Sequence, residues 1–163
     1  MKIAIVGTRG VSVRYSGIET SINEVSKQLA EKGHKIIVYC RKIKDRKTQT
    51  QSLNNIELVY IPTINTKHFD TFIHTFFSTV HLLFSDIDIV HFHALGPSVF
   101  SFLPRVFGKK TVVTVHGLDW KRKKWKYVAR LFLRLCEYYA IYFPNKTIAV
   151  SKNLKDYLEN KYK

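Results

Sequence analysis

The stretch Lys2-Ile-Ala-Ile-Val-Gly-Thr-Arg-Gly10 opens the chain with a short apolar run and ends in a loop that carries two glycines. A run of this length bounded by glycine is typical of a buried strand followed by a turn. Four apolar residues then recur at helical spacing: Ile18, Ile22, Val25 and Leu29. Gly33 follows as a typical helix-terminating residue. The beginning of the chain therefore predicts a strand, a loop and a helix.

The same alternation continues along the chain. Further strands are predicted at residues 35–39, 56–61, 87–93, 111–115 and 146–150. Helices are predicted at residues 69–84, from Pro97 until Pro104 bends or ends the helix, at 120–143, and from Ser151 towards Lys163. Residues 41–52 are polar and basic and predict a mobile loop.

Strands that alternate with helices favour a parallel sheet that is covered on both faces. Right-handed crossovers then favour the strand order 3-2-1-4-5-6. We therefore predict one α/β domain, a Rossmann-like doubly wound parallel sheet of about six strands with helices on both faces.

The composition excludes several classes of protein. The chain has 163 residues, 27 Lys and Arg against 12 Asp and Glu, a formal net charge of +15, and 45% hydrophobic residues. These values exclude a disordered tail and a membrane bundle. Cys40 and Cys136 are the only cysteines, which excludes a disulfide framework and a cysteine-based zinc ribbon and fits a reducing, cytosolic compartment. No run of about 18 apolar residues is free of charge, so we expect no membrane span. The positive charge calls for an anionic partner.

In a sheet of this order the ligand site lies beyond the carboxyl ends of the strands, between the first and the fourth. The loop there carries Gly7, Gly10 and Gly17, which match neither the dinucleotide fingerprint nor the Walker pattern, so an NAD enzyme and an NTPase are disfavoured. The helix N-terminus behind this loop is suited to bind a phosphate. Ser16-Gly-Ile-Glu19 also matches a capping box, a purely structural use of the same helix end.

Three histidines lie near the same edge. His91 and His93 share one face of a predicted strand, and His116 follows the next strand. Together they resemble a three-histidine metal site, but no carboxylate pattern accompanies them. Histidines satisfied within a sheet are the favoured alternative.

Several motifs together resemble family 4 glycosyltransferases, and the resemblance extends over essentially the whole chain. Within the family it points to the rhamnosyltransferase-like bacterial members that build capsule or other surface polysaccharides. The motifs are the opening stretch quoted above, Tyr15-Ser-Gly-Ile-Glu-Thr20, Gly33-His34, His91-Phe-His-Ala-Leu-Gly-Pro97, Val113-Thr-Val-His-Gly-Leu-Asp-Trp120 and Ala149-Val-Ser-Lys152.

The resemblance implies a GT-B enzyme with two Rossmann-like domains. Residues 1–163 would be the N-terminal, acceptor-side domain, and the C-terminal donor-binding domain is absent from this chain. The expected full enzyme moves a sugar, with rhamnose as a candidate, from a nucleotide-diphosphate sugar to a glycan or lipid-linked acceptor and retains the anomeric configuration. We expect the isolated chain to be inactive. Since GT-B chemistry is typically metal-independent, no metal or further cofactor is expected.

The resemblance also assigns residues. Gly17 matches the second glycine of a Gly-Gly turn near the donor diphosphate, and Ser16 replaces the first. His116 matches a histidine beside the transferred sugar, with a positioning and electrostatic role. Arg9 is a further candidate for the donor phosphate. On the acceptor side, the candidates are Arg14, Tyr15, His93 and Gly96.

The positive charge gathers near the C-terminal end of the sequence. Residues 121–134 contain seven basic residues and no acidic one. We interpret this segment as an interfacial helix on anionic lipid, which places the protein at the cytoplasmic face of the cell membrane. The residues expected to face the membrane are Trp120, Lys121, Arg122, Lys123, Lys124, Trp125 and Lys126. A solvated basic face, and attraction of a nucleotide-sugar, remain as alternatives.

A second hypothesis is a non-catalytic basic module that docks on an anionic membrane or on nucleic acid. Nucleic acid is disfavoured because no helix-turn-helix, OB or RRM signature accompanies the basic segment.

Overall fold

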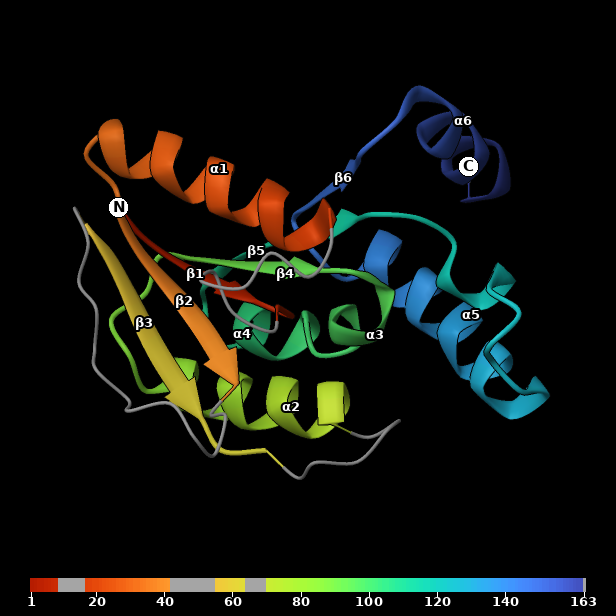
Figure 1. Cartoon of the computed structure of the whole chain (residues 1–163), viewed down its shortest axis with the longest axis horizontal. Coiled ribbons are helices and arrows are strands. Elements are labelled where there is room, and N and C mark those ends of the chain that lie inside the picture. Colours follow the sequence, from red (N-terminus) through yellow and green to blue (C-terminus); the bar gives the residue numbers. More distant parts are fainter. Residues whose placement is uncertain (9–16, 42–54, 64–69, 163) are drawn as a thin grey trace.

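A computed structural model of the chain describes residues 1–8, 17–41, 55–63 and 70–162. Six parallel strands form one sheet in the order β3-β2-β1-β4-β5-β6 (Figure 1). The strands are β1 Lys2–Val6, β2 Lys35–Arg41, β3 Ile56–Ile61, β4 Ile89–His93, β5 Lys110–Val115 and β6 Lys146–Ala149. The predicted strand order and the Rossmann-like fold class are confirmed.

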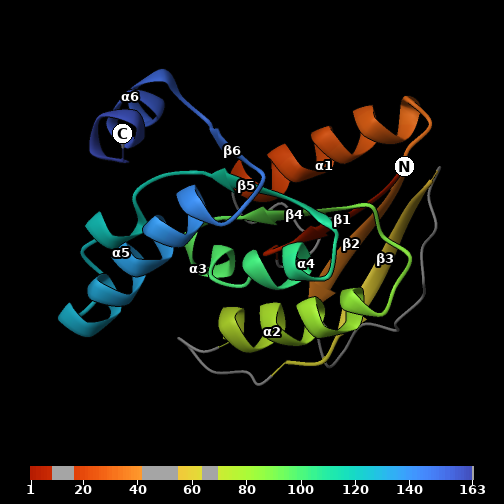
Figure 2. The same ribbon diagram turned by 180° about the vertical axis from the view of Figure 1, so that it is seen from behind.

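Helices cover both faces of this sheet. They are α1 Gly17–Glu31, α2 Asp70–Leu83, α3 Leu95–Ser98, α4 Phe102–Val106, α5 Tyr127–Tyr142 and α6 Lys152–Tyr162, with a 3₁₀ turn, η1, at Asp119–Lys121. Helix α1 lies on one face, and α2, α3 and α4 lie on the other (Figures 1 and 2). The predicted loop at residues 41–52 lies outside the described residues beyond Arg41, which ends β2.

Alternating side chains of the strands build two hydrophobic cores. On the α1 side, Ile22 packs with Ile5 and Val38. On the other side, a larger cluster joins strand residues such as Val6 to Leu82 of α2. It also takes in residues of α3, α5 and α6, namely Leu95, Cys136, Ala140, Leu154 and Leu158. Strands buried on both faces explain why the sequence shows continuous apolar runs.

Two predicted helix termini are confirmed. Gly33 has a φ of +82°, and the amide of His34 donates to the carbonyl of Leu29 at 3.1 Å, as in a Schellman motif. At the start of α6, the Ser151 hydroxyl accepts a hydrogen bond from the amide of Leu154 at 3.3 Å.

The helix predicted at residues 120–143 is wrong in its first part. Helix α5 begins only at Tyr127, and Lys126 before it is extended, with φ −71° and ψ 167°. Five of the six residues at 121–126 are basic, so a helix would stack like charges at spacings of three and four. The basic segment is therefore a connection between η1 and α5.

The helix predicted from Pro97 is divided in two. Helix α3 ends at Ser98, and α4 starts at Phe102 with Pro104 as its third residue. A proline in the first turn of a helix removes no intrahelical hydrogen bond, whereas within one continuous helix Pro104 would have broken one.

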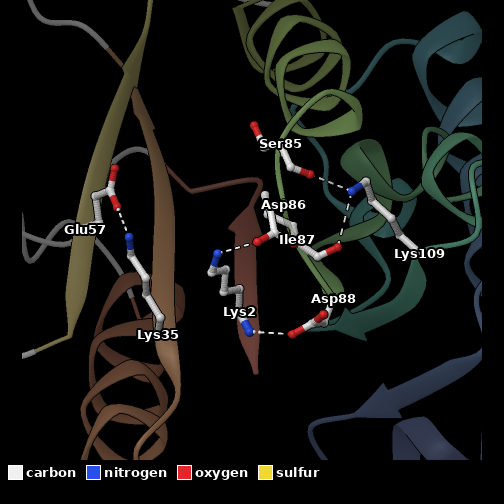
Figure 3. A network of polar contacts seen from close by, with 8 residues as sticks. All are labelled: Lys2, Lys35, Glu57, Ser85, Asp86, Ile87, Asp88 and Lys109. Atoms are coloured by element: carbon white, nitrogen blue, oxygen red, sulfur yellow. Dashed lines mark hydrogen bonds and ion pairs between the residues drawn. The ribbon is translucent and has the colours of Figure 1, made fainter.

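The amino-terminal edge of the sheet is held by exposed polar contacts (Figure 3). The backbone amide of Lys2 donates to Asp88 at 2.7 Å, and Lys35 pairs with Glu57 at 2.9 Å. The Lys109 ammonium donates to the carbonyl of Ser85 at 2.7 Å. Exposed pairs of this kind contribute at most about 1 kcal/mol each, and they lie at the edge opposite the candidate site. Among the described residues, no helix is long and apolar enough to cross a membrane.

Candidate active site

The carboxyl ends of β1, β4 and β5 meet at the centre of the sheet, where the strand order reverses. Gly7 follows β1 with a φ of +102°, and a Cβ atom there would lie 2.5 Å from the carbonyl oxygen of His93. The same atom would lie 3.0 Å from Pro97. Gly7 is therefore required because the loop after β1 passes directly against the loop after β4.

The loop after β4 is itself strained. Ala94 has φ 73° and ψ 164°, a combination that is almost restricted to glycine. Its amide donates to the carbonyl of Thr114 at 3.0 Å, which ties β4 to β5 at this point. Such backbone costs about 1–3 kcal/mol and is concentrated at functional sites.

A row of histidines lies across the ends of β4 and β5, on the α1 side of the sheet. The His91 imidazole bonds Thr114 through Nε2 and Oγ1 at 2.7 Å. His93 Nδ1 lies 3.0 Å from His116 Nε2, and the two rings are stacked at 5.3 Å. His93 thus connects His116 to the sheet and fixes the orientation of its ring.

All three imidazoles are held neutral. Burial, followed by the charge on His116, lowers the pKa of His91 to about 4. Burial, followed by the charges on His91 and His116, lowers the pKa of His93 well below 6.5. Burial also lowers the pKa of His116, although the carboxylates of Asp119 and Glu19 act in the opposite direction. At neutral pH the row offers hydrogen bonds and carries no positive charge.

The first turn of α1 faces this row. The charge of Glu19 acts on His116, and Glu19 is buried although it lies only two residues after the helix start. The buried residues of α1 are Glu19, Ile22, Ser26 and Ala30. In the sequence, Glu19 matches the last position of a capping box, which predicts only a structural role. Its helical spacing with Ile22 was the available signal that it lies on the inner face.

The structure brings four of the candidate residues to this edge of the sheet. Gly17 begins α1, Gly96 lies in α3, and His93 and His116 end or follow β4 and β5. Among the described residues, no atom would lie within 4 Å of a Cβ atom at Gly17 or at Gly96, so this part of the structure leaves the backbone open to close approach at both. The other candidates in the loop between β1 and α1 lie outside the described residues. They are Arg9, Arg14, Tyr15 and Ser16, the serine of the capping box.

Of residues 120–126, which the sequence predicts to face a membrane, Trp120 points into the protein. Trp120 is half-buried, and its indole N–H donates to the Glu137 carboxylate at 2.7 Å, while Arg134 lies 4.6 Å above its ring. This position differs from the membrane boundary expected for Trp120. The basic residues at 121–126 are all exposed, and Trp125 is half-buried.

The sequence left two interpretations of the three histidines, a metal site and histidines paired within the sheet. Across residues 1–8, 17–41, 55–63 and 70–162, no group of three or more His, Cys, Asp and Glu side chains is arranged to hold a metal ion. His91 is paired with Thr114, and His93 with His116. These pairs agree with histidines held within the sheet, although His93 Nε2 is buried without a hydrogen-bond partner among the described residues.

Known proteins resemble this chain in sequence and in fold. The chain is 32% identical over 114 residues to the phosphatidylinositol N-acetylglucosaminyltransferase gpi3 subunit of Schizosaccharomyces pombe, a match that covers 63% of this chain and 24% of that protein. Sucrose-phosphate synthase from Thermosynechococcus elongatus superposes on 98% of this chain with a TM-score of 0.75 at 15% identity, over 44% of its own chain. An E. coli structure described as trehalose-6-phosphate bound with UDP-2-fluoro glucose superposes on 98% of this chain with a TM-score of 0.59 at 10% identity, over 42% of its own chain.

These similarities define what the chain shares with known proteins. At such low identities the two solved structures establish the fold alone. The chain spans about a quarter of the curated relative and less than half of each of these two solved chains. The sequence profile described as Glycosyltransferase Family 4 matches residues 15–163. The chain therefore belongs to glycosyltransferase family 4.

Proposed function

We propose that this chain is the acceptor-side domain of a retaining GT-B glycosyltransferase. The enzyme transfers a sugar from a nucleotide-diphosphate sugar to a lipid-linked or glycan acceptor, and a second Rossmann-like domain supplies most of the donor contacts. Family membership and the partial coverage of longer relatives support this proposal. The name of the Schizosaccharomyces pombe relative contains phosphatidylinositol, a membrane lipid, which supports a lipid acceptor.

The observation that carries the proposal is the position of His116. It directly follows β5, the neighbour of β4 beside the switch between β1 and β4, and His93 at the end of β4 lies 3.0 Å from its ring. Ligands of doubly wound sheets bind at this point. A neutral imidazole donates or accepts a hydrogen bond, so His116 orients a sugar hydroxyl without acting as a general base.

The first turn of α1 supplies the complementary site. Gly17 leaves its backbone open, and the helix N-terminus attracts the leaving diphosphate. Glu19, two residues after Gly17, is buried, and its negative charge favours the protonated form of His116. Departure of the diphosphate is thus assisted electrostatically, and no metal ion is assigned a role.

The finer features of the activity belong to the same proposal. Rhamnose is the candidate donor sugar, and a bacterial surface polysaccharide is the candidate product. The protein works at the cytoplasmic face of the membrane, where nucleotide-sugars are made. The second candidate function, a non-catalytic basic module, is favoured only by the net charge of +15.

Nuclear magnetic resonance tests the proposed donor site on the chain itself. The ¹⁵N-labelled chain is titrated with UDP-, GDP- and dTDP-sugars at millimolar concentration. We expect weak binding, with shift changes confined to Gly17, Gly96, His116 and their neighbours. His116→Ala should abolish these changes, whereas the control His34→Ala, at the amino-terminal end of β2, should leave them intact. Shift changes spread over the exposed lysines, or none with any donor, would refute the assignment.

A further inference from the structure

Helix α2 has its polar and apolar sides largely inverted. Apart from Leu82 near its end, it buries polar residues, namely His74, Thr75, Ser78 and Thr79. Its aromatic residues point outward, with Phe72, Phe76 and Phe77 exposed by 39%, 41% and 50%. A surface helix normally does the reverse, because burying apolar side chains is what stabilises its position.

Two of the buried hydroxyls of α2 have partners within the helix, whereas Ser78 Oγ is buried without a hydrogen-bond partner among the described residues. Thr75 donates to the carbonyl of Thr71 and Thr79 to the carbonyl of Thr75, both at 2.7 Å. Phe72 and Phe76 contact the buried ring of Phe100 at 4.8 and 5.8 Å, so part of each ring packs on the core. The remaining area of the phenylalanines is exposed to solvent and is available to a partner.

Helix α5 is apolar on two sides. Leu133, Cys136 and Ala140 are buried in the core. The opposite side carries Val128, Leu131 and Leu135, which are exposed by 77%, 59% and 51%. Their spacing of three and four residues forms a continuous exposed stripe along the first half of the helix.

The exposed sides of the two helices join into one surface. The rings of Phe72 in α2 and Phe132 in α5 lie 6.1 Å apart, and Phe72 also contacts Phe100 at 4.8 Å. We call this surface the aromatic face. It consists of Phe72, Phe76, Phe77, Val128, Leu131, Phe132 and Leu135. A contiguous apolar surface of this kind on a globular domain marks an interaction site.

The charge around the aromatic face is positive. Residues 121–134, which lead into α5 and form its first half, contain seven Lys and Arg and no acidic residue, and the nearest acidic residues along the chain are Asp119 and Glu137. Asp119 is paired with Arg122, and Glu137 is fully buried. The exposed lysines and arginine at residues 121–126 directly precede the apolar stripe of α5. This arrangement complements a surface that is apolar inside and negatively charged outside, which is the chemistry of an anionic bilayer.

The aromatic face also lies beside the candidate active site. In a parallel α/β sheet the helices between strands start near the carboxyl edge, and Figure 1 shows the first turns of α2 and α5 at that end of the domain. The chain passes from His116 through the basic segment into α5. We propose that the aromatic face inserts into the headgroup region of an anionic lipid bilayer while residues 121–126 bind its phosphates. This docking does not depend on sugar transfer.

Vesicle binding tests the apolar part of this proposal. The purified chain is sedimented with vesicles of phosphatidylcholine alone and with vesicles that also contain phosphatidylserine. The chain should bind the anionic vesicles, and the double variant V128S/L131S should bind them about tenfold less tightly. The control I148S/V150S changes two residues of similar exposure, 46% and 51%, in and just after β6, and should bind like the wild type. All four side chains are exposed, so the variants should fold, which circular dichroism verifies.

Charge variants test the electrostatic part. K123Q/K124Q should weaken binding to anionic vesicles by about fivefold for each lysine removed, and added salt should weaken it further. The control K27Q/K32Q, on and just after α1, should have a much smaller effect. Equal loss from V128S/L131S and I148S/V150S, or no binding to anionic vesicles, would overturn the proposal. So would a dimer in analytical ultracentrifugation that V128S/L131S dissociates, because the aromatic face would then be a protein interface.

Discussion

Glu137 offers a sharp test of how the C-terminal part of the domain is held together. It is fully buried on α5, and four side chains donate hydrogen bonds to its carboxylate. They are Lys161 at 2.6 Å, Trp120 and Tyr162 at 2.7 Å, and Tyr157 at 3.3 Å. The carboxylate thus connects η1, α5 and α6. The perturbation is Glu137→Gln, which keeps the shape of the side chain and removes its charge.

The size of the effect follows from these contacts. A glutamine presents one NH₂ group where the carboxylate had an acceptor, so at least one buried donor loses its partner at a cost of about 1–3 kcal/mol. The other donors then bond a neutral amide oxygen instead of a charged carboxylate, which weakens these hydrogen bonds by about 1 kcal/mol in total. Lys161 is 38% exposed and stays hydrated in the variant, so its ion pair contributes little to the difference. The expected loss in the free energy of unfolding is about 2–4 kcal/mol.

Urea unfolding followed by tryptophan fluorescence measures this loss. Trp120 and Trp125 are the only tryptophans, and Trp120 touches the perturbed carboxylate. In thermal unfolding the same loss lowers Tm by roughly 5–15 °C for a chain of this size. The control Glu24→Gln removes an exposed partner of Lys27 and should cost less than about 0.5 kcal/mol.

The pH dependence gives a second readout of the same carboxylate. Burial alone would raise the pKa of Glu137, but the hydrogen bonds from Lys161, Trp120 and Tyr162 outweigh it, and the pKa falls below 4.5. A carboxylate with a lowered pKa stabilises the fold above its unfolded pKa and loses this effect as the pH falls through the folded value. The difference between wild type and Glu137→Gln should therefore shrink below about pH 4.5. A loss no larger than that of the control at neutral pH would refute the reasoning.

Three further predictions concern the sheet and the isolated chain. The fold keeps His74, His91 and His93 neutral, and the pKa values of the first two are about 4. The free energy of unfolding should therefore fall as the pH falls from about 6.5 towards 4. Urea midpoints that stay constant over this range would contradict this prediction. Gly7→Ala should lower the free energy of unfolding in urea by about 3 kcal/mol or more, because its Cβ would lie 2.5 Å from the carbonyl oxygen of His93. The control Gly17→Ala should change it by less than about 1 kcal/mol. Equal effects of the two variants would exclude the close approach of Gly7 to His93. The isolated 163-residue chain should transfer no sugar from a labelled nucleotide-sugar to a lipid-linked acceptor, and detectable turnover would show that it needs no second domain.

The fold could be predicted because local and global signals agree. Each apolar run such as Lys2–Val6 is bounded by glycine or polar residues, and alternation with helices leaves few allowed topologies. The start of a helix was harder to predict where like charges precede it in the sequence. The spacing of apolar residues predicted a helix that begins at Trp120. Repulsion among the basic residues at 121–126 moves the start of this helix, α5, to Tyr127.

The candidate site was predictable only in part. His93 and His116 could be placed because strand ends converge at one edge of a parallel sheet. The electrostatic effect of Glu19 on His116 could not be predicted, because the two residues are almost 100 positions apart. A local capping box also explained Glu19 equally well. The inversion of α2 was hidden for a similar reason. Periodicity shows that Phe72 and Phe76 share a side of the helix, but not whether that side faces the sheet.

The most direct test of the proposed function is a transfer assay on the protein as its own cells make it. The protein is purified through a tag at Met1, together with any further segment or partner it carries, and is incubated with labelled nucleotide-sugars and the lipid extract of the same cells. The account predicts transfer to lipid with retained configuration, a loss of about 10²-fold or more in His116→Ala, and full activity in the control His34→Ala. Absence of transfer from every donor, or unchanged activity of His116→Ala, would contradict it.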